Sequence, residues 1–378
     1  MWTALKSINF VLHSNRVFRR SLTQLSYSCV ELRNKNVLVV KGKDTYPFLQ
    51  GMVCNDVRHL YLNDENSVHL NCIFSFLLHF NGRVFVDLML YHFDDSLKET
   101  PSKTPSEWEG KDDDKIFIEC DSSLSDQLFD YMKMHKLRKK VDISVDKEYT
   151  VHCIYPNIVS TDENLTLEPL KEIRGNNCLM TKDPRLNHLG YRLLKQGSLD
   201  LEEISEKLDQ ELISSTLMEY REHRYKLGVG EGAEDHPTGS SFALECNADY
   251  LHGLSFRKGC FVGQELTARV YHTGVIRKRL MPIHLIDKSE SNDLQTNETI
   301  FARDKKTKLG KLRSFHGQYG LALLNVEEVT KSEFTVFCKD VELKVTKPDW
   351  WPKGSQKDHI PCGRSDHDLK EQHCNYKS

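Results

Sequence analysis

A β-hairpin is the element that most constrains how this chain can fold. Residues Val68–Phe80 and Arg83–Tyr91 are both rich in β-branched and aromatic side chains, and Asn81-Gly82 stands between them. Asn-Gly is a strong signal for a tight turn between two antiparallel strands. We therefore expect a hairpin here, with further short strands over Asn36–Val40 and Ile116–Cys120.

Helical periodicity is clearest over Asp121–Lys140, where apolar side chains fall near one face. A second helical region covers about residues 201–227 and is interrupted near its middle. Its last part directs Arg224 partly inward, and a buried arginine is uncommon without a partner. Arg224 can therefore bind an anionic ligand or pair with an acid, for which Glu245 and Glu265 are candidates.

The first thirty residues differ from the rest of the chain. They hold four basic residues, five serines and no acid, with apolar residues that can form one face of a helix. An acid-free amphipathic leader rich in arginine and serine is typical of a mitochondrial transit peptide, although a disordered basic tail has a similar composition. Residues 1–30 are therefore predicted to be a transit peptide.

Composition argues against several function classes. Removal of the four leader cations shifts the formal net charge from −3 to about −7, and a mildly acidic protein is a poor candidate for non-specific nucleic-acid binding. The small basic cluster Arg277–Arg279 is expected to be a strand edge or a solvated face. The longest apolar stretch, Cys72–Phe80, is too short to span a bilayer. Eleven cysteines without a C-x-x-C pair predict thiols in a reducing compartment.

Composition also marks domain boundaries. Residues 94–115 are dense in charged residues, serine and proline, and are expected to form a flexible insertion in a hairpin. The polar residues 287–299 are expected to link to a separate unit of short β runs over 300–346, closed by Asp349–Pro352. Residues 356–378 are polar and charged, and are predicted to be a disordered tail.

The strongest chemical signal lies in Phe256–Glu265, which reads F-R-K-G-C-F-V-G-Q-E. Its cysteine, Cys260, directly follows a glycine and two cations, Arg257 and Lys258. Nearby cations favour the thiolate, which is the form that attacks electrophiles and binds metal, and glycine allows close backbone approach. The motif therefore predicts an accessible, reactive sulfur. The alternative is a buried core cysteine in a tight turn.

Several further segments stand in a fixed register with this motif. From Arg221 onward the chain carries R-E-H-R-Y-K-L-G-V-G-E-G, F-A-L-E-C-N, K-G-C-F-V-G-Q-E-L-T-A-R and T-G-V-I-R-K-R-L-M-P. Earlier it carries F-L-Q-G-M-V-C-N-D-V at Phe48–Val57, N-G-R-V-F-V-D-L at Asn81–Leu88 and D-P-R at Asp183–Arg185. Together these segments resemble the YgfZ branch of the glycine-cleavage T-protein superfamily, also called GcvT-like. The resemblance covers about residues 32–352.

The resemblance implies an α+β fold. It implies two interleaved GcvT-like α+β domains around a central channel over 32–286, and then a C-terminal β-barrel over 299–352. It also implies a role in the mitochondrial matrix, in the late pathway that builds [4Fe–4S] clusters. The implied partners are an A-type iron–sulfur carrier protein and client [4Fe–4S] enzymes such as aconitase-like enzymes and lipoyl synthase. Neither a nucleic acid nor a membrane is expected as a partner.

The mechanistic hypothesis centres on Cys260. Cys260 supplies one thiolate to a [2Fe–2S] cluster that bridges to the carrier, whose own cysteines complete the coordination. Arg257 and Lys258 lower the pKa of the thiol and offset the charge of the cluster. Gln264 and Glu265 hold the loop or contact the partner.

A folate-dependent enzyme is the alternative that the resemblance raises. The parent T-protein is a tetrahydrofolate-dependent aminomethyltransferase, and Asp87 falls at the second of two adjacent acids in its motif, where the first is Val86 here. A carboxylate in an apolar strand can have a raised pKa and transfer protons, or it can simply accept hydrogen bonds from nearby backbone. Tetrahydrofolate binding through Asp87 and Arg224 is thus a second hypothesis. A binding scaffold in which Cys260 only packs is a third.

Overall fold

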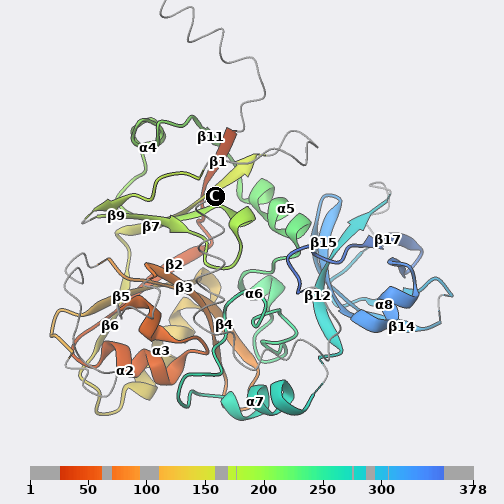
Figure 1. Cartoon of the computed structure of the whole chain (residues 1–378), viewed down its shortest axis with the longest axis horizontal. Helices are drawn as coiled ribbons and strands as arrows, with labels where there is room; N and C mark the ends of the chain where they lie inside the picture. The colour runs from red at the N-terminus through yellow and green to blue at the C-terminus, as the bar shows by residue number, and fades with distance from the viewer. Residues whose placement is uncertain are drawn as a thin grey trace, which may run out of the picture.

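The computed structural model of this chain describes eight segments: residues 26–61, 70–93, 110–157, 169–175, 177–274, 276–286, 294–304 and 306–352. Most of the predicted leader and insertion, and the whole of the predicted tail, lie outside these segments. The first described element, strand β1 (Ser26–Glu31), already contains the last five residues of the predicted leader. Two sheets lie one above the other, and a barrel stands beside them (Figure 1).

The first sheet contains the hairpin that the sequence predicts. Within the described segments it has five antiparallel strands in the order β3-β4-β5-β2-β6. Their bounds are β2 Lys35–Lys41, β3 Cys72–Leu78, β4 Val84–Tyr91, β5 Lys115–Asp121 and β6 Asp142–Asp146. Every side chain of β3 and β4 is buried, because helices cover one face of this sheet and the second sheet covers the other.

The second sheet draws its strands from both sides of the first one in the sequence. Its order is β11-β1-β7-β10-β9-β8, and β1 pairs in parallel with β11. The remaining strands are β7 Tyr149–Asn157, β8 Arg174–Gly175, β9 Cys178–Lys182, β10 Tyr191–Gln196 and β11 Leu212–Ser214. Because β1 precedes the first sheet and β7 follows it, the two units are interleaved, as the family resemblance implies.

The helices correct the expected boundaries. The region expected as one helix over 121–140 is a short 3-10 turn, η5 (Ser122–Leu124), and then α3 (Ser125–Lys136), which ends where Leu137 takes a φ of 48°. The region about 201–227 is two helices separated by strand β11. The bounds of the helical elements are α2 Thr45–Met52, η2 Val57–Leu60, η6 Asn187–Leu189, α4 Leu201–Leu208, α5 Leu217–Leu227, α6 Gly232–Asp235, α7 Gln264–Thr273 and α8 Val326–Lys331.

The C-terminal unit is a closed barrel in the order β12-β15-β14-β13-β16-β17. Its strands are β12 Lys278–Leu285, β13 Thr299–Ala302, β14 Lys308–His316, β15 Tyr319–Asn325, β16 Thr335–Cys338 and β17 Val341–Val345. Closure leaves no strand edge unpaired. After β17, Trp351 packs into the barrel core, and Trp350 Nε1 donates a hydrogen bond to Leu227 O at 2.7 Å. This bond fastens the barrel to α5.

The basic cluster Arg277–Arg279 is divided. Arg277 and Lys278 are exposed at the start of β12, as expected, but Arg279 is not. Arg279 is buried, and its guanidinium donates two hydrogen bonds of 2.8 Å to the carboxylate of Asp249. It also lies 3.7 Å from the centre of the Tyr250 ring. Alternation along β12 turns Arg279 inward, so its charge serves to hold the barrel against the preceding loop. None of the helices in the described segments is long and apolar enough to cross a membrane.

Candidate functional site

Cys260 lies on the loop that leads into α7 and is exposed to solvent. Of the nine cysteines in the described segments, Cys178 is partly exposed and the other seven are buried. Burial raises the pKa of several of these thiols; the pKa of Cys246, for example, rises to about 12. Cys260 is therefore the most exposed of the described cysteines and the one most open to a large electrophile or to a metal centre on another protein.

The loop around Cys260 is anchored to the segment that follows α2. Ser255 N donates to Cys54 O at 3.1 Å, and Val262 N donates to Gly51 O at 3.1 Å. These bonds join two of the recognised motifs, F-L-Q-G-M-V-C-N-D-V and K-G-C-F-V-G-Q-E. The long separation in sequence makes this anchorage a product of the tertiary fold.

Lys258 has a different role from the one expected. Its side chain is buried, and its ammonium donates to the carbonyl oxygens of Val53 and Asn55 at 2.5 and 2.8 Å. Burial lowers the pKa of Lys258 to about 8. We expected the ammonium group of Lys258 to lie beside the Cys260 thiolate, but it is hydrogen-bonded to two backbone carbonyl oxygens instead. The exposed cation of the motif is Arg257.

The two residues after Gly263 divide between the loop and the surface. Gln264 Oε1 accepts a hydrogen bond from Phe261 N at 3.4 Å, so its side chain closes the turn after Cys260. Glu265 is exposed and pairs with Arg269 at 2.7 Å, one helical turn along α7. Gln264 therefore helps to hold the loop, and the expected contact of Glu265 with a partner stays a prediction.

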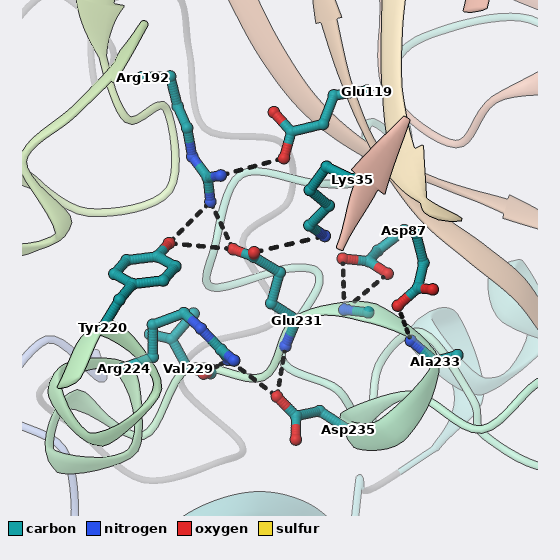
Figure 2. A network of polar contacts seen from close by, with 12 residues as sticks. Lys35, Asp87, Glu119, Arg192, Tyr220, Arg224, Val229, Glu231, Ala233 and Asp235 are labelled. Carbon is teal, nitrogen blue, oxygen red and sulfur yellow. Dashed lines mark hydrogen bonds and ion pairs between the residues drawn. The ribbon is translucent and has the colours of Figure 1, made fainter. Parts of the chain in front are cut away.

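A buried network of charges fills the region between the two sheets (Figure 2). Arg192 of β10 is at its centre and has no exposed surface. Its guanidinium donates to Glu119 Oε1 at 3.0 Å, to Asp183 Oδ2 at 3.1 Å, to the Tyr220 hydroxyl at 2.9 Å and to Glu231.

Glu231 is the acid on which the cations of this network converge. It contacts Arg192, Lys35 Nζ at 3.3 Å and Arg185 Nη2 at 2.8 Å. Burial opposes ionisation, but Arg192, Lys35 and Arg185 together hold the pKa of Glu231 well below its usual range. Arg185 also forms a bidentate ion pair with Asp183, with hydrogen bonds of 2.8 and 3.0 Å. This pair gives the Asp and the Arg of the D-P-R segment a structural role.

Asp87 is buried on β4, and its carboxylate faces the start of α6. Both of its oxygens accept from the backbone N–H of Gly232 at 3.1 Å (Figure 2). Nearby, Ala233 N donates to Asp121 Oδ2 at 2.9 Å. The free N–H groups at the start of a helix attract anionic side chains. The two carboxylates therefore fix the G-E-G-A segment against the first sheet.

The expected partners of Arg224 were wrong. Its guanidinium donates to Asp235 Oδ2 at 2.8 Å and to Val229 O at 3.0 Å, and it pairs with neither Glu245 nor Glu265. Asp235 also accepts from Tyr225 at 2.9 Å and from Ser314 of the barrel at 2.6 Å. Arg224 is thus part of the junction between α5, α6 and the barrel.

Sequence reasoning did not identify most members of the buried network. The residues missed were Lys35, Glu119, Arg192, Tyr220, Glu231 and Asp235. One signal was available, since the stretch after Gly228 is rich in both glycine and acids. Gly228 itself ends α5 with a φ of 75°. In the described segments, no three His, Cys, Asp or Glu side chains are arranged so that they could hold a metal ion.

Comparison with curated proteins identifies the family. The human protein "Iron-sulfur cluster assembly factor IBA57, mitochondrial" is 32% identical over 338 residues, which is 88% of this chain and 87% of its own length. The mouse protein of the same name is 30% identical over 339 residues, with 88% and 87% covered. The chain belongs to the IBA57 family. A homologue of this family from Dictyostelium discoideum is 29% identical over 295 residues, which is 76% of this chain and 70% of its own length.

Two further comparisons concern the fold of this family member. The family model described as "CAF17, C-terminal beta-barrel domain" matches residues 277–353, which contain β12–β17. A crystal structure of glycine cleavage system aminomethyltransferase T from Bartonella henselae superposes with a TM-score of 0.60 and covers 87% of each chain. At 12% identity this likeness shows a common fold, and it confirms the expected GcvT-like architecture.

Proposed function

We propose that this chain is an assembly factor for mitochondrial [4Fe–4S] proteins that acts with an A-type cluster carrier through Cys260. The IBA57 relatives are named as mitochondrial iron–sulfur cluster assembly factors. The observation that carries the proposal is the exposure of Cys260 on an anchored loop, while seven other described cysteines are buried. The acid-free leader supports import to the matrix.

The cluster is cargo that passes between proteins. The Cys260 thiolate ligates one iron of a [2Fe–2S] cluster, and cysteines of the carrier supply the other ligands. A single ligand from this chain keeps the cluster exchangeable, because the carrier retains most of the coordination. Arg257 is exposed beside the loop and offsets the negative charge of the cluster. Gln264 keeps the turn closed, so that the sulfur is presented in one geometry.

Anaerobic reconstitution tests this proposal. An A-type carrier loaded with [2Fe–2S] is mixed with wild-type chain, with Cys260→Ser and with Cys178→Ser, the control at the partly exposed cysteine. We expect wild-type and Cys178→Ser proteins to change the absorption spectrum of the cluster in the same way. With Cys260→Ser, the absorption spectrum should stay that of the cluster-loaded carrier alone. A full spectral change with Cys260→Ser contradicts the proposal.

Folate-dependent transfer has less support. Both oxygens of Asp87 accept a hydrogen bond from the backbone N–H of Gly232. The acid that was expected to transfer protons beside the folate therefore already has a structural partner. The cations of the same region, Lys35, Arg185 and Arg192, are paired with acids of the chain. These residues do not fit a bound tetrahydrofolate, and no step of the proposed mechanism uses one.

A further inference from the structure

The turn of the β3–β4 hairpin carries a large apolar side chain in full contact with solvent. Phe80 is 89% exposed, more than any other large apolar side chain of the described segments. The turn itself is well fixed, since Gly82 N donates to His79 O and His79 N donates to Arg83 O, both at 2.8 Å. Isolated exposed apolar residues are common, so its meaning depends on what lies beside it.

The hairpin turn packs directly against the motif loop. Gly82 and Gly263 both have positive φ, 78° and 75°. A Cβ atom on Gly263 would lie 2.3 Å from His79 O, and one on Gly82 would lie 2.8 Å from Leu266 Cβ. Only glycine permits this approach at both positions. The turn that carries Phe80 and the loop that carries Cys260 are therefore one rigid unit, at the end of the first sheet where α7 lies (Figure 1).

Helix α3 supports the hairpin from its other side. The Tyr131 hydroxyl donates to Leu78 O at 3.3 Å, and the Tyr131 and His79 rings are 6.3 Å apart. Beyond this contact, Met134 is 67% exposed and Leu137, just after the helix, is 86% exposed. Exposed apolar side chains are thus present both on the hairpin turn and at the end of α3, the helix that contacts the hairpin.

Chain geometry keeps Phe80 and Cys260 close enough together for one interface to span both. The short stretches that join each residue to the Gly82–Gly263 contact limit the separation of their Cα atoms to about 23 Å. A standard protein interface buries about 800 Å² on each partner, which corresponds to a round patch about 30 Å across. A partner that reaches the Cys260 sulfur can therefore cover Phe80 as well.

Charge indicates the chemistry of that partner. Exposed cations lie in the same segments as the apolar side chains, with Arg257 beside Cys260 and Lys133 and Arg138 at the end of α3. The exposed acids of the motif and of the last two turns of α3 are Glu265 and Asp130, and Glu265 is paired with Arg269. A thiolate-bound cluster carries net negative charge, and acidic side chains around it would complement this surface. Aromatic side chains are also the residues that most often dominate binding energy at interfaces.

We propose that Phe80 is the apolar anchor of the surface on which the cluster-bearing carrier docks against Cys260. This inference rests on the proposed function and adds a recognition residue to it. Phe80 enters an apolar pocket of the carrier, while the cations around it face acidic side chains. The rigid contact between the hairpin turn and the motif loop aligns the sulfur with the cluster as docking occurs.

The test measures the affinity of the full chain for an A-type carrier loaded with [2Fe–2S], under anaerobic conditions, by titration calorimetry. Phe80→Ala should raise the dissociation constant at least tenfold. The matched control is Met218→Ala, which removes a half-exposed apolar side chain from α5, and it should change the constant less than twofold. Because Phe80 is exposed, its variant should keep the wild-type melting temperature.

The cluster spectrum separates the two proposals. At saturating carrier, Phe80→Ala should still give the wild-type spectrum, and Cys260→Ser should not. An affinity of Phe80→Ala within twofold of wild type overturns the docking surface, even when Cys260→Ser loses the spectral change. Weaker binding by Phe80→Ala together with a normal spectrum for Cys260→Ser supports the docking surface and overturns the ligand role of Cys260.

Discussion

The carboxylate of Asp87 is held by the backbone N–H of Gly232, with both oxygens at 3.1 Å. The two residues are 145 positions apart, and their contact joins the first sheet to the start of α6. The acid that suggested folate chemistry thus has a structural partner. The exposed thiol of Cys260 lies on a different loop, so the two hypotheses can be separated by substitution.

Asp87→Asn should lower stability and spare the cluster reaction. The variant loses a charge-assisted bond to a buried N–H group, at a cost of about 1–3 kcal/mol in the free energy of unfolding. Urea denaturation measures this cost. Cluster formation with the carrier should remain wild-type under native conditions, and its loss in a fully folded variant would show that Asp87 takes part. Calorimetric titration with tetrahydrofolate tests the folate hypothesis. Binding to the wild-type chain that Asp87→Asn weakens would support that hypothesis.

Arg192→Met should strongly destabilise the fold. It leaves Glu119, Asp183 and Glu231 without the cation between them, and loss of one member of a buried ion pair costs about 3–5 kcal/mol. The control is Lys207→Ala, which removes an exposed ion pair with Glu203 and should leave the free energy of unfolding essentially unchanged. Chemical denaturation compares the two, and equal stabilities would contradict the role given to Arg192.

Gly263→Ala should disturb the loop that presents Cys260. Alanine at a φ of 75° is strained, and its Cβ would clash with His79 O, so we expect a loss of at least about 1 kcal/mol. Gly259→Ala is the matched control in the same motif, because a Cβ there meets nothing within 4 Å. The cluster spectrum with carrier should weaken for Gly263→Ala and stay normal for Gly259→Ala. The opposite order would exclude the packing explanation.

Stability should fall as the pH drops from about 6.5 to 4, because of His152. Burial lowers the pKa of His152 to about 4, so over this range the unfolded chain binds a proton that the folded chain does not. The contribution of neutral His152 to stability is fully present above the pKa that the histidine has in the unfolded chain. It is lost as the pH falls toward the lower pKa of the folded chain. Glu31 opposes this shift and Lys195 favours it. The contribution reaches at most about 3 kcal/mol.

Urea unfolding at several pH values measures this slope. His152→Gln, which cannot titrate, should flatten it over the same range. An unchanged slope in His152→Gln would assign the pH dependence to other groups.

Local signals in the sequence determined the hairpin and the position of the chemical motif. Asn81-Gly82 predicts a turn because its conformational demand is local, and Gly317-Gln318 forms the β14–β15 turn for a similar reason. The two-sheet and barrel architecture followed from the family motifs, since periodicity alone does not say which strands share a sheet.

The tertiary structure alone decided which charges meet. Arg192 pairs with Glu119 and Glu231, which are 73 and 39 positions away, and no local pattern encodes such a pairing. It also directed Lys258 inward to two carbonyl oxygens and left Cys260 exposed on the same loop. Sequence determines which side chains are available, but burial and partner choice depend on how distant strands pack, because the energy of a charge is set by its surroundings.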